Sequence, residues 1–179
     1  LHYFLGIAAH VIAIDENVRA SIPRNSNVSV VHNSFTVDNY STKTRYPYSF
    51  DINNPLRIGF VGNLQKAKGV LELLSALRIL LGHGVHCRLL MVGSDISGFT
   101  RPFELLLKGL SLSQSVKQEV LSEYTEWASD YVELVGHQID ISSFYERMDL
   151  LVFPSHFNAP GRPVFEAAFF GVPSIICCD

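Results

Sequence analysis

The sequence predicts an α/β fold, a Rossmann-like doubly wound parallel sheet. Short apolar runs alternate with helical patterns along most of the 179 residues, which is typical of βαβ units. The runs are apolar at successive positions, as expected of strands that helices cover on both faces. Right-handed crossovers between parallel strands then give the doubly wound arrangement, in which ligands bind at the carboxyl ends of the strands.

Three elements are expected near the start of the chain. The apolar, β-branched runs "HVIAI" (10–14) and "VSVVH" (28–32) predict strands, and "ENVRASI" (16–22) between them predicts a helix. Residues 34–55 are polar and turn-rich without sustained periodicity, so we expect a linker there. We therefore divide the sequence into the end of one domain at 1–33, the linker at 34–55 and a second domain at 56–179.

A longer alternation of strands and helices follows the linker. The run "LRIGFV" (56–61) predicts a strand, and apolar positions from Val70 to Leu81 at helical spacing predict a helix that Gly82 and Gly84 end. Further strands are expected at 86–92, 131–135, 150–154 and 173–178, and further helices at 102–128, 141–148 and 163–170.

Charge and hydropathy exclude several classes of function. The net charge of -3 leaves no basic excess for phosphate backbones, so no nucleic-acid binding is expected. Histidine and arginine side chains interrupt the most hydrophobic stretches, and no run reaches the roughly 18 apolar residues of a transmembrane helix. Since the sequence begins at Leu1 and shows no signal-peptide pattern, we expect a segment of a longer cytoplasmic chain.

The cysteines and histidines do not predict a metal site. Cys87, Cys177 and Cys178 form no CxxC pair, and the run "SIICCD" predicts a buried strand that holds the last two. We expect structural thiols in a reducing compartment. His83 and His86 have no cysteine or acidic partner at the spacing of metal ligands.

The loop "GNLQKAKG" (62–69) joins a predicted strand to a predicted helix. Lys66 and Lys68 lie just before that helix, where the aligned peptide dipoles already amount to about half a positive charge. Lysines at this place favour an anionic ligand between them and the helix. The alternative is that Lys68 points into water.

A second loop, "PSHFNAPGRP" (154–163), leads into the helix expected at 163–170. Pro163 suits the first helical position, and Gly161 allows a ligand to approach the backbone closely. Glu166 is expected in the first helical turn, where the helix dipole favours a carboxylate. That dipole alone explains Glu166 without a ligand.

Three stretches together resemble a known family. They are "RIGFVGNLQKAKGVLELLSAL", "CRLLMVGSD" and "VELVGHQIDISSFYERMDLLVFPSHFNAPGRPVFEAAFFGVPSII". In this order they are similar to the donor-binding half of retaining glycosyltransferases with the two-Rossmann-domain GT-B fold, family 4 type. The preceding "AAHVIAIDENVRASI" and "VSVVHNSFTVDNY" resemble the end of the acceptor-side domain and its crossover. The resemblance implies one half of a GT-B fold, incomplete, with 56–179 as a truncated nucleotide-sugar-binding domain.

The resemblance implies transfer of a sugar from a nucleotide-diphosphate sugar with retention of configuration, without a metal or other cofactor. The acceptor would be a glycan, a lipid-linked sugar or a small molecule, and the remainder of the N-terminal domain leaves room for peripheral contact with the inner face of the membrane. Glu166 matches a glutamate that binds the ribose hydroxyls of the donor. Asn158 stands where the family has another glutamate, and Asn63 stands where it has an arginine ahead of Lys68.

Lys68 and Asn158 are therefore the catalytic candidates, with Lys68 neutralising the leaving diphosphate. The donor-binding candidates are Gly62, Asn63, Lys68, Gly136, His137, Asn158, Ala159, Pro160, Gly161, Arg162 and Glu166. Arg162 or Lys66 would replace the lost arginine, or Arg162 would only cover surface. Gly136 and His137 match the base-binding region, although an ordinary loop histidine fits equally. Tyr145, Phe157 and Phe169 would line a pocket or, more commonly for such aromatics, belong to the core.

Two other functions remain open at this point. With Asn63 and Asn158 in place of charged residues, the chain could be a nucleotide-sugar-binding module with little or no transferase activity. The other is a GT-B sugar-nucleotide epimerase, which would need acid and base side chains between two domains.

Overall fold

The computed structural model describes residues 8–23, 27–32, 50–93, 116–156 and 161–177. The chain divides into two compact units, Leu1–Asp38 and Asn39–Asp179. The boundary between them lies inside the range 34–55, most of which is outside the described residues. Each unit is considered by itself.

The first unit contains a small parallel sheet. Strands β1 (Val11–Ala13) and β2 (Val28–Val30) pair in parallel, with Val11 opposite Val28, and helix α2 (Glu16–Ala20) connects them. The carboxylate of Asp15 accepts a hydrogen bond of 2.7 Å from the backbone N–H of Val18, which caps the start of α2. All three predicted elements are present, each slightly shorter than expected.

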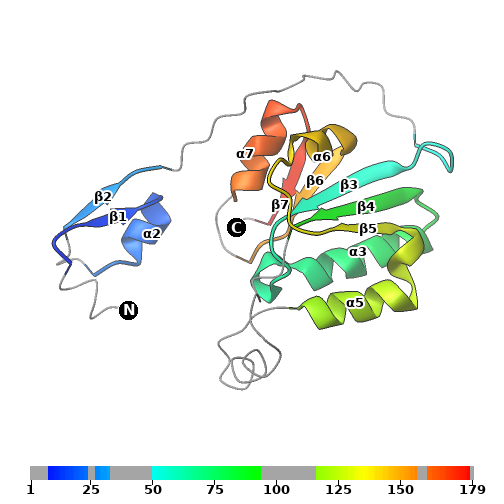
Figure 1. Cartoon of the computed structure of the whole chain (residues 1–179), viewed down its shortest axis with the longest axis horizontal. Coiled ribbons are helices and arrows are strands. Elements are labelled where there is room, and N and C mark those ends of the chain that lie inside the picture. The colour runs from blue at the N-terminus through cyan, green and yellow to red at the C-terminus, as the bar shows by residue number, and fades with distance from the viewer. Residues whose placement is uncertain (1–7, 24–26, 33–49, 94–115, 157–160, 178–179) are drawn as a thin grey trace. The chain divides into compact units, whose positions relative to one another are not determined.

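The second unit contains a five-stranded, wholly parallel sheet in the order β5-β4-β3-β6-β7 (Figure 1). The strands are β3 (Leu56–Val61), β4 (Cys87–Val92), β5 (Val132–Val135), β6 (Leu150–Phe153) and β7 (Ser174–Ile176). Along the chain, β3 comes first and the next two strands extend the sheet to one side, whereas β6 and β7 extend it to the other. The strand order therefore reverses between β3 and β6, which is where doubly wound sheets bind their ligands.

Helices cover both faces of this sheet, as the sequence predicts. Helices α3 (Val70–Gly82) and α5 (Lys117–Glu126) lie on one face, and α6 (Ser142–Arg147) and α7 (Arg162–Phe169) lie on the other (Figure 1). Two short 3-10 turns, η1 (Lys66–Lys68) and η2 (Ala128–Asp130), precede α3 and β5. Of the helix expected at 102–128, the described part is α5 with η2.

The α3 face holds the main hydrophobic core. Alternate residues of β3 and β4, such as Ile58 and Leu89, pack against Leu73 and Leu77 of α3. These leucines belong to the apolar stripe predicted from the sequence. A buried leucine that is cut back to alanine costs about 2 to 5 kcal/mol, so this face supplies much of the stability of the sheet that positions the loops.

The opposite face of the sheet is packed through two specific contacts. Met148 is fully buried against Gly59 of β3, where an added Cβ would lie 2.0 Å from the methionine sulfur. The ring of Tyr145 stacks on that of Phe170, with 5.4 Å between ring centroids. Tyr145 therefore belongs to the core, the more common of the two placements expected from the sequence.

Strand β7 differs from the expectation. Ile175 and Ile176 are 57% and 39% exposed, and Cys177 after them is exposed as well. The prediction that this run forms a buried strand is therefore wrong. Among the described strands β7 pairs only with β6, so no described strand lies beside its other edge. Cys87 is buried, as expected, and Cys178 lies outside the described residues.

Candidate functional site

The two loops singled out by the sequence meet where the strand order reverses. The first leaves the carboxyl end of β3 and the second leaves that of β6. The backbone N–H of His156 donates a 2.9 Å hydrogen bond to the carbonyl of Ala67, and the His156 ring lies 3.2 Å from the carboxylate of Glu72 on α3. The structure thus confirms that the loops lie side by side on one edge of the sheet.

Gly69 is the point of closest approach between them. Its φ of 67° is left-handed, and an added Cβ would lie 2.0 Å from the backbone carbonyl oxygen of Pro154. Only glycine meets both requirements, because a side chain here would be strained and would also overlap the other loop. The close packing places Lys68, the preceding residue, beside the end of β6.

Lys68 does not simply point into water. It is half-buried at the end of η1, and its ammonium lies over the ring of Phe153, with 5.1 Å from Nζ to the ring centroid. Burial lowers the pKa of Lys68 from its ordinary value, because desolvation disfavours the charged form. Lys66, the other lysine of the turn, is exposed.

The helix that carries Glu166 begins one residue earlier than predicted. Gly161 is its N-cap, so Arg162 takes the first position and Pro163 the second, where the lost N–H is equally harmless. Glu166 then falls outside the first turn, and the expectation that it lies within that turn is wrong. Since the dipole effect fades beyond the first turn, it is a weaker explanation of this carboxylate than the sequence indicated.

Glu166 is instead held by hydrogen bonds inside the protein. The residue is only 7% exposed; the Tyr145 hydroxyl donates to Oε2 over 2.8 Å and Arg162 Nε donates to Oε1 over 2.5 Å. Burial and the adjacent Glu166 raise the pKa of Tyr145, so its hydroxyl stays protonated and remains a donor. Each carboxylate oxygen has two acceptor positions, which leaves capacity for a ligand.

Two residues of the second loop have packing roles that the sequence did not reveal. Arg162 is the ion-pair partner of Glu166, a role beyond the two expected for it. At Gly161, an added Cβ would lie 2.3 Å from the ring of Phe153. The close approach that this glycine permits is therefore that of an aromatic ring of β6.

The remaining predicted residues lie along the same edge or outside the described residues. Gly62 and Asn63 follow β3, and an added Cβ on Gly93 after β4 would lie 2.0 Å from the Gly62 carbonyl oxygen. Gly136 and His137 follow β5, two strands from β3, and are exposed. At a strand spacing of about 4.8 Å, they lie about 10 Å along the edge from β3.

Asn158, Ala159 and Pro160, together with Phe157, lie outside the described residues. Phe169 is 41% exposed on α7. Across the described ranges, the structure contains no group of three or more His, Cys, Asp or Glu side chains that could hold a metal ion. Within the same ranges, it contains no helix of the length and hydrophobicity needed to cross a bilayer.

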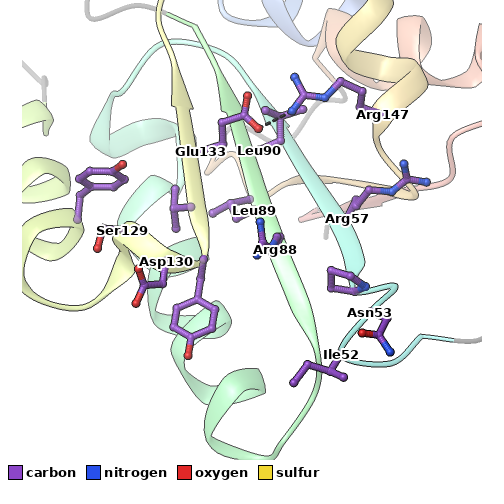
Figure 2. A pocket seen from close by; sticks show the side chains of 14 residues that line it. Ile52, Asn53, Arg57, Arg88, Leu89, Leu90, Ser129, Asp130, Glu133 and Arg147 are labelled. Atoms are coloured by element: carbon purple, nitrogen blue, oxygen red, sulfur yellow. Dashed lines mark hydrogen bonds and ion pairs between the residues drawn. The ribbon is translucent and has the colours of Figure 1, made fainter.

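A cavity of about 690 Å³ lies at the opposite edge of the sheet, by the amino ends of β3, β4 and β5 (Figure 2). Arg57 makes two hydrogen bonds from its guanidinium to the buried carboxylate of Asp149, at 2.9 and 2.7 Å, and Arg147 pairs with Glu133. Both pairs neutralise arginines at the cavity. Two of the three arginines that line the cavity, Arg57 and Arg147 but not Arg88, are thus shown paired with carboxylates, and the sequence did not single the cavity out.

Fold and site together define a class of protein. The sheet is doubly wound, and two neighbouring loops at its reversal point carry a half-buried lysine and lead into the helix that holds a buried glutamate. Residues 55–178 match the family model of the glycosyl transferases group 1. The chain belongs to this family, and its fold is one half of the GT-B arrangement.

Similar proteins agree with this assignment. The chain is 26% identical over 182 residues to the capsular polysaccharide biosynthesis glycosyltransferase CapM of Staphylococcus aureus. The alignment covers 94% of the chain and 43% of CapM. Among solved structures, HepE of Anabaena in complex with UDP-glucose superposes with a TM-score of 0.66 at 21% identity, over 94% of the chain and 44% of HepE. Sucrose-phosphate synthase of Thermosynechococcus elongatus superposes with a TM-score of 0.63 at 20% identity, over 98% of the chain and 42% of the synthase. The chain thus spans less than half the length of these proteins.

Proposed function

We propose that this chain is the donor-binding half of a glycosyltransferase that transfers a sugar from a nucleotide-diphosphate sugar with retention of configuration. The observation that carries the proposal is the placement of Lys68 in the first loop and of Glu166 on the helix that follows the second, with the two loops adjoining at the reversal point of the sheet. One residue supplies positive charge for a diphosphate, and the other supplies acceptor oxygens for hydroxyl groups.

In this proposal Lys68 stabilises the leaving diphosphate. Negative charge grows on the diphosphate as the anomeric bond breaks, so a positive group already in place lowers the barrier. Helix α3 begins two residues after Lys68 and is 13 residues long, and no side chain hydrogen bond caps its N-terminus in the described structure. Its first N–H groups add to the positive potential at the same place.

Glu166 would accept hydrogen bonds from the ribose hydroxyls of the donor. Tyr145 and Arg162 orient its carboxylate and use one acceptor position on each oxygen. Gly62, Asn63, Gly136 and His137 would bind the donor along the same edge. In the second loop, Asn158 would contact the sugar, and Ala159, Pro160, Gly161 and Arg162 would form the rest of the binding loop.

UDP-sugars are the first donors to test, because HepE was solved with UDP-glucose and CapM is described as a capsular polysaccharide glycosyltransferase. We propose that the reaction needs no metal or other cofactor. The acceptor would be a glycan, a lipid-linked sugar or a small molecule. We also propose a cytoplasmic location, with peripheral membrane contact through the part of the N-terminal domain outside this chain.

The test is sugar transfer by the full-length protein from labelled UDP-, GDP- and ADP-sugars. Lys68→Ala is expected to lower kcat/KM by about 30- to 150-fold, which corresponds to the roughly 2 to 3 kcal/mol of one electrostatic contact in the transition state. Lys117→Ala, at the exposed start of α5, is the matched control. Unchanged turnover in Lys68→Ala would contradict the assignment.

The same assay separates the alternatives. A nucleotide-sugar-binding module would bind nucleotide but show neither transfer nor hydrolysis of the labelled donor. An epimerase would change the configuration of the sugar without transferring it. The position of Lys68 favours bond cleavage at the diphosphate, because a preorganised cation there stabilises the leaving group.

A further inference from the structure

We propose that Phe153 is a positioning residue for Lys68, holding the ammonium in place for the donor diphosphate. The inference rests on the proposed function, since it takes Lys68 as the group that meets the diphosphate. It goes beyond that function because Phe153 is a buried residue of β6 and is not among the donor-binding candidates.

The contact itself is specific. Phe153 is the last residue of β6 and is only 3% exposed, and Lys68 Nζ lies over its ring, 5.1 Å from the centroid. The face of an aromatic ring carries partial negative charge and attracts a cation within about 6 Å. The attraction is stronger where part of the surrounding water is excluded, as it is around half-buried Lys68.

The ring is held from a second side by the other loop. An added Cβ on Gly161, the N-cap of α7, would lie 2.3 Å and 2.6 Å from two atoms at the outer end of the ring. Pro154, directly after Phe153, is in equally close contact with Gly69. The aromatic ring therefore lies where both loops of the candidate site meet, and its position depends on both.

A lysine gains from such support because its four-carbon stem is flexible. Fixing that stem costs conformational entropy, which a donor would otherwise have to offset on binding. Contact with the ring orders the ammonium before the donor arrives, and it offsets part of the desolvation that disfavours the charged form of Lys68. A preorganised charge is more effective at the transition state than one that must be assembled there.

The chain offers a matched control for this contact. Arg147 lies over the ring of Phe144 on α6, with 5.7 Å to the centroid, so the same kind of cation–π pair occurs where no catalytic or donor-binding role is assigned. Replacing Phe144 by leucine removes an aromatic face under a cation without touching Lys68. A loss of activity confined to Phe153→Leu would then reflect the position of the contact.

The experiment is a double-mutant cycle in the full-length protein, with kcat and KM measured for labelled UDP-, GDP- and ADP-sugars. Phe153→Leu is expected to lower kcat/KM by about 3- to 30-fold, the range of a partly desolvated cation–π contact, and Phe144→Leu by less than about twofold. In a Lys68→Met background, Phe153→Leu should have an effect of less than about twofold, because the group that it positions is absent.

Each outcome decides the question. Equal losses from Phe153→Leu with and without Lys68 would overturn the inference and leave Phe153 a packing residue, as would a Phe153→Leu variant with wild-type kinetics. Loss only in the presence of Lys68 supports it, even if Phe153→Leu is less stable, since a folding defect would persist in the Lys68→Met background. A wild-type protein that neither binds nor turns over these donors would overturn the proposed function itself.

Discussion

Replacing Gly69 by alanine is the sharpest test of how the two loops are packed. The substitution adds one methyl group to a residue with a φ of 67°, and that methyl would lie 2.0 Å from the Pro154 carbonyl oxygen. Because the neighbour is backbone, neither loop relieves the overlap by rotating a side chain. The loop that carries Lys68 must move away from β6, or the strand end must move.

Two other glycines separate the contributions to the cost. Gly82, at the end of α3, has open space around its Cα and no positive φ, so alanine there is expected to be neutral or to stabilise by up to about 1 kcal/mol. Gly84 also has open space but a φ of 76°, so alanine there carries only the left-handed strain, about 1 to 2 kcal/mol. Gly69→Ala adds overpacking of about 1 to 3 kcal/mol to that strain, for a total of about 2 to 5 kcal/mol.

The assay is urea unfolding followed by the fluorescence of Trp127, the one tryptophan of the sequence, which packs against the core beside α5. The free energy of unfolding is expected to be highest for Gly82→Ala, lower for Gly84→Ala and lowest for Gly69→Ala. If Gly69→Ala were no more destabilising than Gly84→Ala, the loops would not be packed as described. The placement of Lys68 beside β6 would then lose its basis.

Two further predictions concern the charged groups. Tyr145→Phe is expected to lower the free energy of unfolding by about 1.5 to 3 kcal/mol, because buried Glu166 loses a hydrogen-bond donor. In the same urea assay Tyr131→Phe, at an exposed ring, should change it by less than about 0.5 kcal/mol, and equal effects would contradict the buried hydrogen bond. Calorimetric UDP affinity should fall as pH rises from about 7 to about 10, because burial lowers the pKa of Lys68 and the neutral amine no longer attracts the diphosphate. The fall should be smaller in Lys68→Arg, whose guanidinium stays charged throughout, and an equal fall in both proteins would contradict the role of Lys68.

The elements of this fold are predictable because their signals are local. Alternating apolar runs and helical spacing located the described strands and helices, and Gly84, with its left-handed φ, follows the end of α3 where the sequence predicts it. The start of α7 was misplaced by one residue, since Pro163 fits the first or second helical position equally well. That small difference placed Glu166 in the wrong turn and overstated the part played by the helix dipole.

The candidate site was predictable only in part. Lys68 and Glu166 were identified from their positions in or beside the two loops and from the resemblance to the family, but their partners were not. Tyr145 is 21 residues from Glu166 in the sequence, and Phe153 is far from Lys68, so no local pattern connects either pair. An aromatic residue in an apolar run indicates burial, and burial alone does not say which charged group lies against it.

The sequence by itself determined the order and type of the elements, the edge of the sheet where the two candidate loops meet, and the family. Periodic apolar positions state which face of a strand or helix must be buried, and glycine marks where the backbone needs a special conformation. Only the tertiary structure decided that Glu166 is held by Tyr145 and Arg162, that Phe153 lies under Lys68, and that Ile175 of β7 is exposed. The physical reason is that these contacts join segments distant along the chain, whose positions depend on packing across the whole sheet.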